Sequence, residues 1–89
     1  MSATYALNPK VSLAETDDGA VLLHERTGRY WQLNATGLLV LRSLTSGDSP
    51  EQAAQTLASR HTLPATRARD DVAALLASLC SADLLREGR

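Results

Sequence analysis

Between Lys10 and Asn34 the apolar residues alternate with a period of two, and two turn signals that end in glycine interrupt the pattern. The turn signals are Asp17-Asp18-Gly19 and Arg26-Thr27-Gly28. A glycine at the third position of a hairpin loop suits the left-handed backbone that such loops require. The pattern therefore predicts three antiparallel strands in a meander, at Val11–Thr16, Ala20–Glu25 and Arg29–Leu33.

Three-residue loops set the register of this predicted sheet. They place Leu23 opposite both Leu13 and Trp31, so that one face gathers the apolar side chains of Leu13, Val21, Leu23, Trp31 and Leu33. The other face then receives Ala14, Leu22, His24, Tyr30 and Gln32. A two-residue Asp18-Gly19 loop would instead place Leu13 opposite His24 and divide the apolar set, so we favour the three-residue loops.

From Asn34 onward the apolar period becomes helical. Asn34 is a good N-cap for a first helix with a leucine face, and Gly47 ends that helix. Ser49-Pro50-Glu51-Gln52 contains the Ser cap, the first-turn Pro and the Gln of a capping box, which predicts a second helix to about Arg60. A third helix is expected from Ala65 or Thr66, with an apolar face of Val72, Leu75, Leu76 and Leu79.

These elements predict an α+β fold that is winged-helix-like: a three-stranded antiparallel β-meander followed by three α-helices packed on one face. We expect a single domain over residues 1–89 with an ordered core at about 10–86, because residues 1–9 show no periodic pattern. Leu84 and Leu85 are expected to form a short apolar tail.

The composition argues against several classes of function. Nine Lys and Arg residues nearly balance ten Asp and Glu residues, so a protein that binds nucleic acid through phosphate contacts is not expected. No apolar run approaches the roughly 20 residues of a membrane span, and the N-terminus lacks the features of a secretory signal, so a cytoplasmic domain is expected. The one cysteine, Cys80, excludes a disulfide and a cysteine-based metal site.

Few side chains are available for catalysis. Cys80 follows Leu79 in an apolar helical stretch, where we interpret it as a small buried residue. We expect His24 and His61 to be solvated or locally hydrogen-bonded. Asp70 and Asp71 are adjacent in a helix, so their side chains diverge and favour the helix N-terminus rather than a shared site. We therefore expect no enzyme, no metal and no cofactor.

The third strand forms an edge of the predicted sheet. It contains Tyr30 and Trp31 and no proline, so it can accept an extended peptide as a fourth strand. Trp31 is interpreted both as a core residue and as part of the binding cleft. For Tyr30, peptide contact and a solvent-facing position remain equally open.

The stretch from Glu25 to Gly37, with the sequence Glu-Arg-Thr-Gly-Arg-Tyr-Trp-Gln-Leu-Asn-Ala-Thr-Gly, resembles leader-peptide recognition elements of ribosomal peptide natural-product pathways. These domains are similar to the small peptide chaperone of pyrroloquinoline quinone biosynthesis. The resemblance covers about residues 10 to 86, and is closest to the stand-alone form found in lasso-peptide clusters. It continues through Gly47, Ser49-Pro50-Glu51, Asp71-Val72, the leucines of the third helix and Leu84-Leu85. His24 departs from the pattern, which has an acidic residue there, at a position that we place outside the cleft.

The resemblance implies a non-catalytic protein that binds the leader of a lasso precursor peptide and presents it to a separate leader protease and an ATP-dependent cyclase. The leader, in which a Tyr-x-x-Pro element is expected, would lie antiparallel to strand three beside helix three. The residues implied for peptide binding are Arg29, Tyr30, Trp31, Gln32, Leu33, Arg67, Ala68, Asp71, Val72, Leu75 and Leu79. Which residues of helix three belong to the core instead is left open, and Arg67 and Asp71 suit a solvated helix start equally well.

Two alternatives remain. One is a recognition element of another peptide natural-product or quinone-cofactor pathway. The other is a winged-helix DNA-binding protein, which would need a basic recognition helix. The third predicted helix balances Arg67 and Arg69 with Asp70 and Asp71, so this alternative is disfavoured.

Leader binding through main-chain pairing and apolar pockets predicts a weak dependence on salt. Between 50 and 200 mM salt we expect the affinity to change by less than about tenfold, whereas a protein with 6–10 phosphate contacts loses about 10³–10⁵. Fluorescence polarisation with a labelled leader peptide measures this change. A steep loss of affinity would indicate a partner bound mainly by charge.

Overall fold

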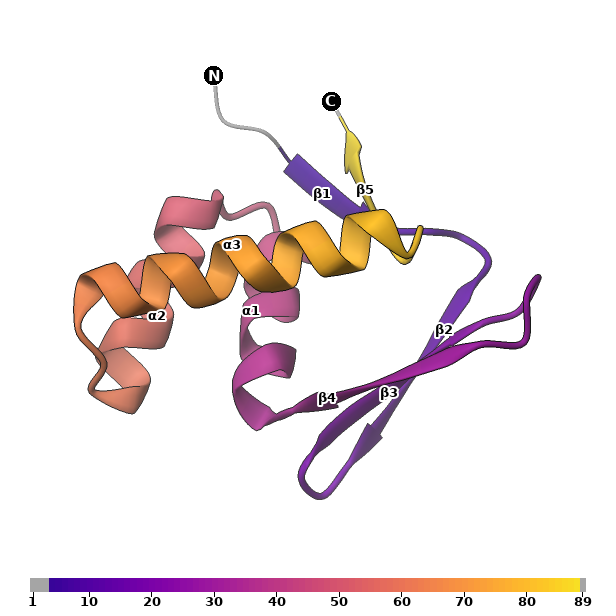
Figure 1. Cartoon of the computed structure of the whole chain (residues 1–89), viewed down its shortest axis with the longest axis horizontal. Helices are drawn as coiled ribbons and strands as arrows, with labels where there is room; N and C mark the ends of the chain where they lie inside the picture. The colour runs from indigo at the N-terminus through magenta and orange to yellow at the C-terminus, as the bar shows by residue number, and fades with distance from the viewer. Residues whose placement is uncertain (1–3, 89) are drawn as a thin grey trace.

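A computed structural model describes residues 4–88 of the chain and confirms the α+β class, with a meander followed by helices (Figure 1). In chain order, the elements are β1 (Thr4–Leu7), β2 (Val11–Thr16), β3 (Gly19–His24), β4 (Tyr30–Asn34), α1 (Ala35–Thr45), α2 (Pro50–His61), α3 (Ala65–Ser81) and β5 (Leu85–Gly88). Strands β2, β3 and β4 form an antiparallel sheet in that order. The helices lie on one side of this sheet, and α1 packs against it.

The predicted register of β3 is wrong by one residue. Thr16 pairs with Gly19 across a two-residue Asp17-Asp18 turn, and Leu22, rather than Leu23, lies opposite both Leu13 and Trp31. A slip of one residue moves every side chain of a strand to the other face. Leu22 is therefore fully buried, whereas Leu23 is 38% exposed on the outer face of the sheet.

Close packing at Gly19 explains the two-residue turn. A Cβ atom at this position would overlap the backbone carbonyl of Leu33, so Gly19 is needed as the first residue of β3 rather than as the last residue of a loop. The sequence pattern could not decide between the two registers, because both sets of alternate positions in β3 are apolar. Ala20 and Leu22 point to one face of the sheet, and Val21 and Leu23 point to the other. Only contact with β4 distinguishes them.

The second hairpin turn includes one residue more than predicted. The backbone N–H of His24 donates to the carbonyl of Arg29 at 2.8 Å, and the N–H of Gly28 donates to the carbonyl of His24 at 2.8 Å. The loop therefore comprises residues 25–28. Gly28 has φ +74°, a left-handed conformation that glycine adopts without strain, as the turn signal predicted.

The helix starts agree with the sequence signals. The Asn34 side chain accepts a hydrogen bond from the N–H of Gly37 at 2.8 Å and caps α1. Ser49 and Gln52 form both hydrogen bonds of the predicted capping box at the start of α2, where Pro50 is the first helical residue. Helix α3 begins at Ala65 as expected.

A second sheet, formed by β1 and β5, lies outside the prediction. Thr4 pairs with Gly88 and Leu7 with Leu85, so the two ends of the described chain run antiparallel (Figure 1). Residues 4–9 are thus part of the fold, although the sequence predicted no structure for residues 1–9; residues 1–3 lie outside the described part. Leu84 and Leu85, which were expected to form a short apolar tail, are both fully buried in the core, and Leu85 is the first residue of β5.

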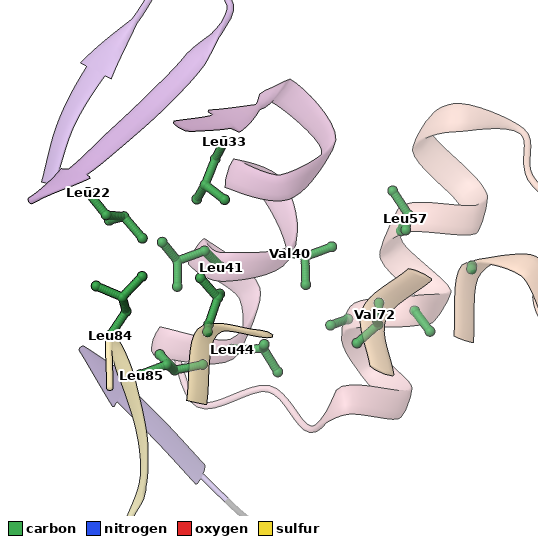
Figure 2. Close-up of a cluster of buried hydrophobic side chains, with 13 residues drawn as sticks. Leu22, Leu33, Val40, Leu41, Leu44, Leu57, Val72, Leu84 and Leu85 are labelled. Atoms are coloured by element: carbon green, nitrogen blue, oxygen red, sulfur yellow. The ribbon is translucent and has the colours of Figure 1, made fainter. Parts of the chain in front are cut away.

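The core is built around α1 (Figure 2). Val40, Leu41 and Leu44 of this helix are buried in the core cluster. The other labelled side chains of this cluster come from the sheet, from α2 and α3, and from the start of β5 with the residue before it: Leu22, Leu33, Leu57, Val72, Leu84 and Leu85. Within residues 4–88, no helix combines the length and apolar character that crossing a membrane requires.

The corrected register predicts opposite effects of two neighbouring substitutions. Leu22→Ala should lower the free energy of unfolding by about 2–5 kcal/mol, because it leaves a cavity in the core. Leu23→Ala, on the outer face, should cost less than about 1 kcal/mol. Urea unfolding of both variants measures the difference, and the reverse order would restore the register predicted from the sequence.

Candidate functional site

The outer edge of β4 offers unpaired backbone groups. The hydrogen bond from the His24 N–H to the Arg29 carbonyl shows which residues of β4 direct their backbone groups toward β3. In an antiparallel ladder, residues whose backbone groups bond to the neighbouring strand alternate with residues whose groups point away from it. The backbone groups of Trp31 and Leu33 consequently face β3, and those of Tyr30 and Gln32 point away from it. No other strand in residues 4–88 pairs with β4 on that side.

Two pockets, each of about 690 Å³, border α3; the first reaches β4 at Trp31, and the second reaches it only at its last residue, Asn34. The first, here called the hairpin pocket, lies between the β3–β4 hairpin, with Arg26, Arg29 and Trp31, and the end of α3, with Ser78, Ser81 and Asp83. The second, the helix pocket, lies between the start of α1, the end of α2 and the middle of α3. Both pockets include Ser78, so they adjoin at this position of α3, and we refer to the two together as the groove.

The structure places some of the predicted site residues on the groove. Arg29 and Trp31 line the hairpin pocket, and Arg67, Asp71 and Leu75 line the helix pocket. Arg67 and Asp71 lie one helical turn apart, with Arg67 Nε 4.0 Å from Asp71 Oδ2.

Other predicted residues do not present side chains to the groove. Tyr30, which is 69% exposed, pairs with Leu23, so its side chain lies on the outer face of the sheet. Gln32 has the same parity as Tyr30 and is also exposed, so it can offer the groove edge only backbone groups. A further group has its side chains in the core, where they support β4 and α3 from behind: Leu33, Ala68, Val72 and Leu79.

Trp31 both packs against the core and lines the hairpin pocket. Its ring is half-buried, packs against the core cluster and forms a wall of the hairpin pocket. The guanidinium carbon of Arg29 lies 5.6 Å from the centre of the ring, within cation–π distance. Because Trp31 is the one tryptophan of the chain, its fluorescence can report on occupation of this pocket.

The buried side chains of Asn8 and His24 form a polar cluster with the exposed carboxylate of Asp83, and His24 and Asp83 line the hairpin pocket. Asn8 Nδ2 donates to the Asp83 carbonyl at 2.8 Å and to Asp83 Oδ2 at 3.1 Å. His24 Nε2 lies 3.6 Å from the same carboxylate oxygen, and His24 is only 4% exposed. Placing His24 outside the cleft was therefore wrong: the shifted register of β3 turns its side chain inward, toward the pocket.

The turn at Asp83 brings the carboxylate into this cluster. Asp83 has φ +60°, a left-handed conformation that Asp tolerates better than most residues. A hydrogen bond from Arg86 holds the pKa of the Asp83 carboxyl below its usual value, and contact with His24 contributes in the same direction. The Asp83 carboxylate is thus already committed to partners within the protein.

The interpretation of Cys80 as a buried residue is wrong, whereas His61 is solvent-exposed as the sequence suggested. Cys80 is an exposed free cysteine on α3, and His61 is exposed at the end of α2. The pKa of the Cys80 thiol is raised, mainly by its partial burial and to a smaller extent by the negative charge of the Glu87 carboxylate. A raised pKa disfavours the thiolate and hence nucleophilic chemistry.

Sequence reasoning missed Asn8, Arg26, Ser78 and Asp83 as residues of the groove or its border. Arg26 lies within the hairpin motif and could have been found from it, because hairpin residues flank an edge strand. Asn8 and Asp83 are 75 residues apart, and no local pattern connects them.

Comparisons with known proteins find one family and two solved structures that resemble the chain. A family model described as coenzyme PQQ synthesis protein D (PqqD) matches residues 19–85. The solved structure of lasso peptide synthetase B1 complexed with the leader peptide is 43% identical, covers 94% of this chain and 99% of its own, and has a TM-score of 0.88. TbiB1 in complex with the TbiA(beta) leader peptide is 28% identical, with coverage of 91% and 94% and a TM-score of 0.82. No curated protein sequence matches the chain.

Removal of the Asn8 side chain should destabilise the fold. Asn8→Ala removes the hydrogen bond that Asn8 Nδ2 donates to the Asp83 carbonyl. It also removes the hydrogen bond that Asn8 Oδ1 accepts from the Lys10 N–H at 3.0 Å. We expect a loss of about 1–3 kcal/mol in urea unfolding. Ser59→Ala, at an exposed position of α2, is the control and should change stability by less than about 0.5 kcal/mol. Equal stability of both variants would mean that the cluster does not hold the chain ends.

Proposed function

The chain belongs to the PqqD family, and we propose that it captures the leader region of a ribosomally made lasso precursor peptide. The observation that carries the proposal is the unpaired edge of β4 beside a groove that α3 borders. Both similar solved structures are complexes with leader peptides, and one is 43% identical over nearly the whole chain. This identity to a lasso protein favours the lasso pathway over a quinone-cofactor pathway.

In the proposed complex, the leader adds to β4 as an antiparallel strand. The N–H and C=O groups of Tyr30 and Gln32, which point away from β3, would pair with the leader backbone. Alternate leader side chains would then enter the groove. Burial of two apolar side chains contributes about 1.5–3 kcal/mol each, which after the cost of ordering the peptide suggests a Kd between about 10 nM and 10 μM.

The proposed contacts divide according to where each side chain lies. Arg29 and Trp31 would contact the leader in the hairpin pocket, and Arg67, Asp71 and Leu75 in the helix pocket. Tyr30 and Gln32 would contribute backbone groups. Leu33, Ala68, Val72 and Leu79 would act by holding the two sides of the groove in place. A Tyr-x-x-Pro element in the leader would supply one apolar group for each pocket.

The proposed role is non-catalytic. The bound leader would be presented to a separate protease that removes it and to an ATP-dependent cyclase that closes the lasso ring. The proposal assigns the protein the task of holding the substrate, because a strand added to an edge leaves the remainder of the precursor free to reach another protein.

Residue-resolved hydrogen exchange tests where the leader binds. The probe is the leader peptide bound in the 43% identical relative. On adding it, protection should rise at the outward-facing amides of Tyr30 and Gln32 and in the first turns of α3. The amides of Trp31 and Leu33 should change less, because they already face β3.

Strand β2 is the internal control, since it forms the other edge of the same sheet. Its amides, from Val11 to Glu15, should be unchanged. New protection along β2, or on the surface of α2, would contradict the proposed site.

A further inference from the structure

Two arginines at the hairpin pocket have no carboxylate partner. Arg26 and Arg29 both line this pocket, both are exposed, and neither forms an ion pair within residues 4–88. Most other described arginines do have an acidic partner; the pairs are Arg42 with Glu15, Arg67 with Asp71, Arg69 with Glu51, and Arg86 with Asp83. The hairpin pocket therefore carries positive charge that the protein itself does not neutralise.

The acidic groups near this pocket are already occupied. The Asp83 carboxylate accepts hydrogen bonds from Asn8 and Arg86 and lies close to His24. Glu25, next to Arg26 in sequence, accepts a hydrogen bond from Ser12 across the sheet. Neither carboxylate is paired with Arg26 or Arg29, so both guanidinium groups are available to a ligand.

The two ends of the groove differ in charge. In the helix pocket, Asp71 compensates Arg67 within one helical turn. In the hairpin pocket, Arg26 and Arg29 are uncompensated, and the Arg29 guanidinium is held over the Trp31 ring. The uncompensated positive charge of the groove therefore lies at its hairpin end.

We propose that the hairpin pocket is a carboxylate subsite, in which Arg26 and Arg29 bind an Asp or Glu side chain of the leader. The inference rests on the proposed function, because antiparallel pairing with β4 brings the carboxyl-terminal end of the paired leader segment beside Arg29. Backbone pairing alone allows a strand to slip in register. A charged contact at one end selects a single register and direction.

A Glu/Gln scan of the peptide tests this subsite. The probe is again the leader peptide bound in the 43% identical relative, synthesised with Glu and, separately, with Gln at each position of the paired segment. Glu and Gln are nearly the same size, so each pair of peptides isolates the charge. At one position near the carboxyl-terminal end, the Glu peptide should bind about threefold to fivefold more tightly than the Gln peptide in fluorescence polarisation.

Protein variants assign the effect to the two arginines. Arg26→Gln combined with Arg29→Gln should remove the preference for Glu, whereas Arg29→Lys, which keeps the charge, should retain most of it. Arg26→Gln alone should reduce the preference without touching the contact between Arg29 and Trp31. Arg60→Gln is the matched control, because Arg60 also lacks an ion pair in the described residues but lies outside both pockets; it should leave the preference unchanged.

Three results would overturn the proposal in distinguishable ways. If the unmodified peptide binds but no position prefers Glu, or the preference survives in the double variant, the carboxylate subsite is wrong and the proposed function stands. If the unmodified peptide does not bind at all, the proposed function fails and the subsite fails with it. A preference for Glu only near the amino-terminal end would overturn the assigned direction.

Discussion

Burial of the apolar face of α1 is the interaction on which the rest of the structure depends. Val40, Leu41 and Leu44 are enclosed by the sheet, the other helices and the segment that precedes β5 (Figure 2). Helix α1 packs against the sheet, and α2 packs against both α1 and α3. Among residues 4–88, the outer edge of β4 has no partner strand, and α3 lines both pockets of the groove. The same packing that stabilises the domain therefore creates its proposed binding groove.

An exposed edge strand is usually a hazard, because it can pair with any other strand. In this protein the hairpin pocket lies beside the start of this edge, and the helix pocket, which differs in charge, reaches only its last residue, Asn34; this difference would restrict the peptides that bind well. The polar cluster of Asn8, His24 and Asp83 links the chain ends to the β3–β4 hairpin and maintains the wall of one pocket. The polar cluster that supports the fold thus lies beside the pocket that we propose to select the peptide.

Much of the candidate site was accessible to sequence reasoning. The meander pattern identified the edge strand with Arg29 and Trp31, and the resemblance to leader-peptide recognition elements pointed to Arg67, Asp71 and Leu75, which line the groove. The sequence could not separate these from core residues such as Ala68, because both kinds recur at helical spacing. Burial depends on which neighbouring helix covers each position, and that is a property of the packed structure.

Local signals determined the helix starts, the class of fold and the position of the free edge, because caps, turns and periodicity act between residues that are close in sequence. The tertiary structure alone decided the register of β3, where Leu22 rather than Leu23 is buried, and the pairing of β1 with β5. It also decided that His24 lines the groove. Each of these features depends on contacts between segments that are distant in sequence. A central strand with apolar residues at both sets of alternate positions is oriented only by its neighbouring strands. Strands β1 and β5 pair because the core brings the two segments together.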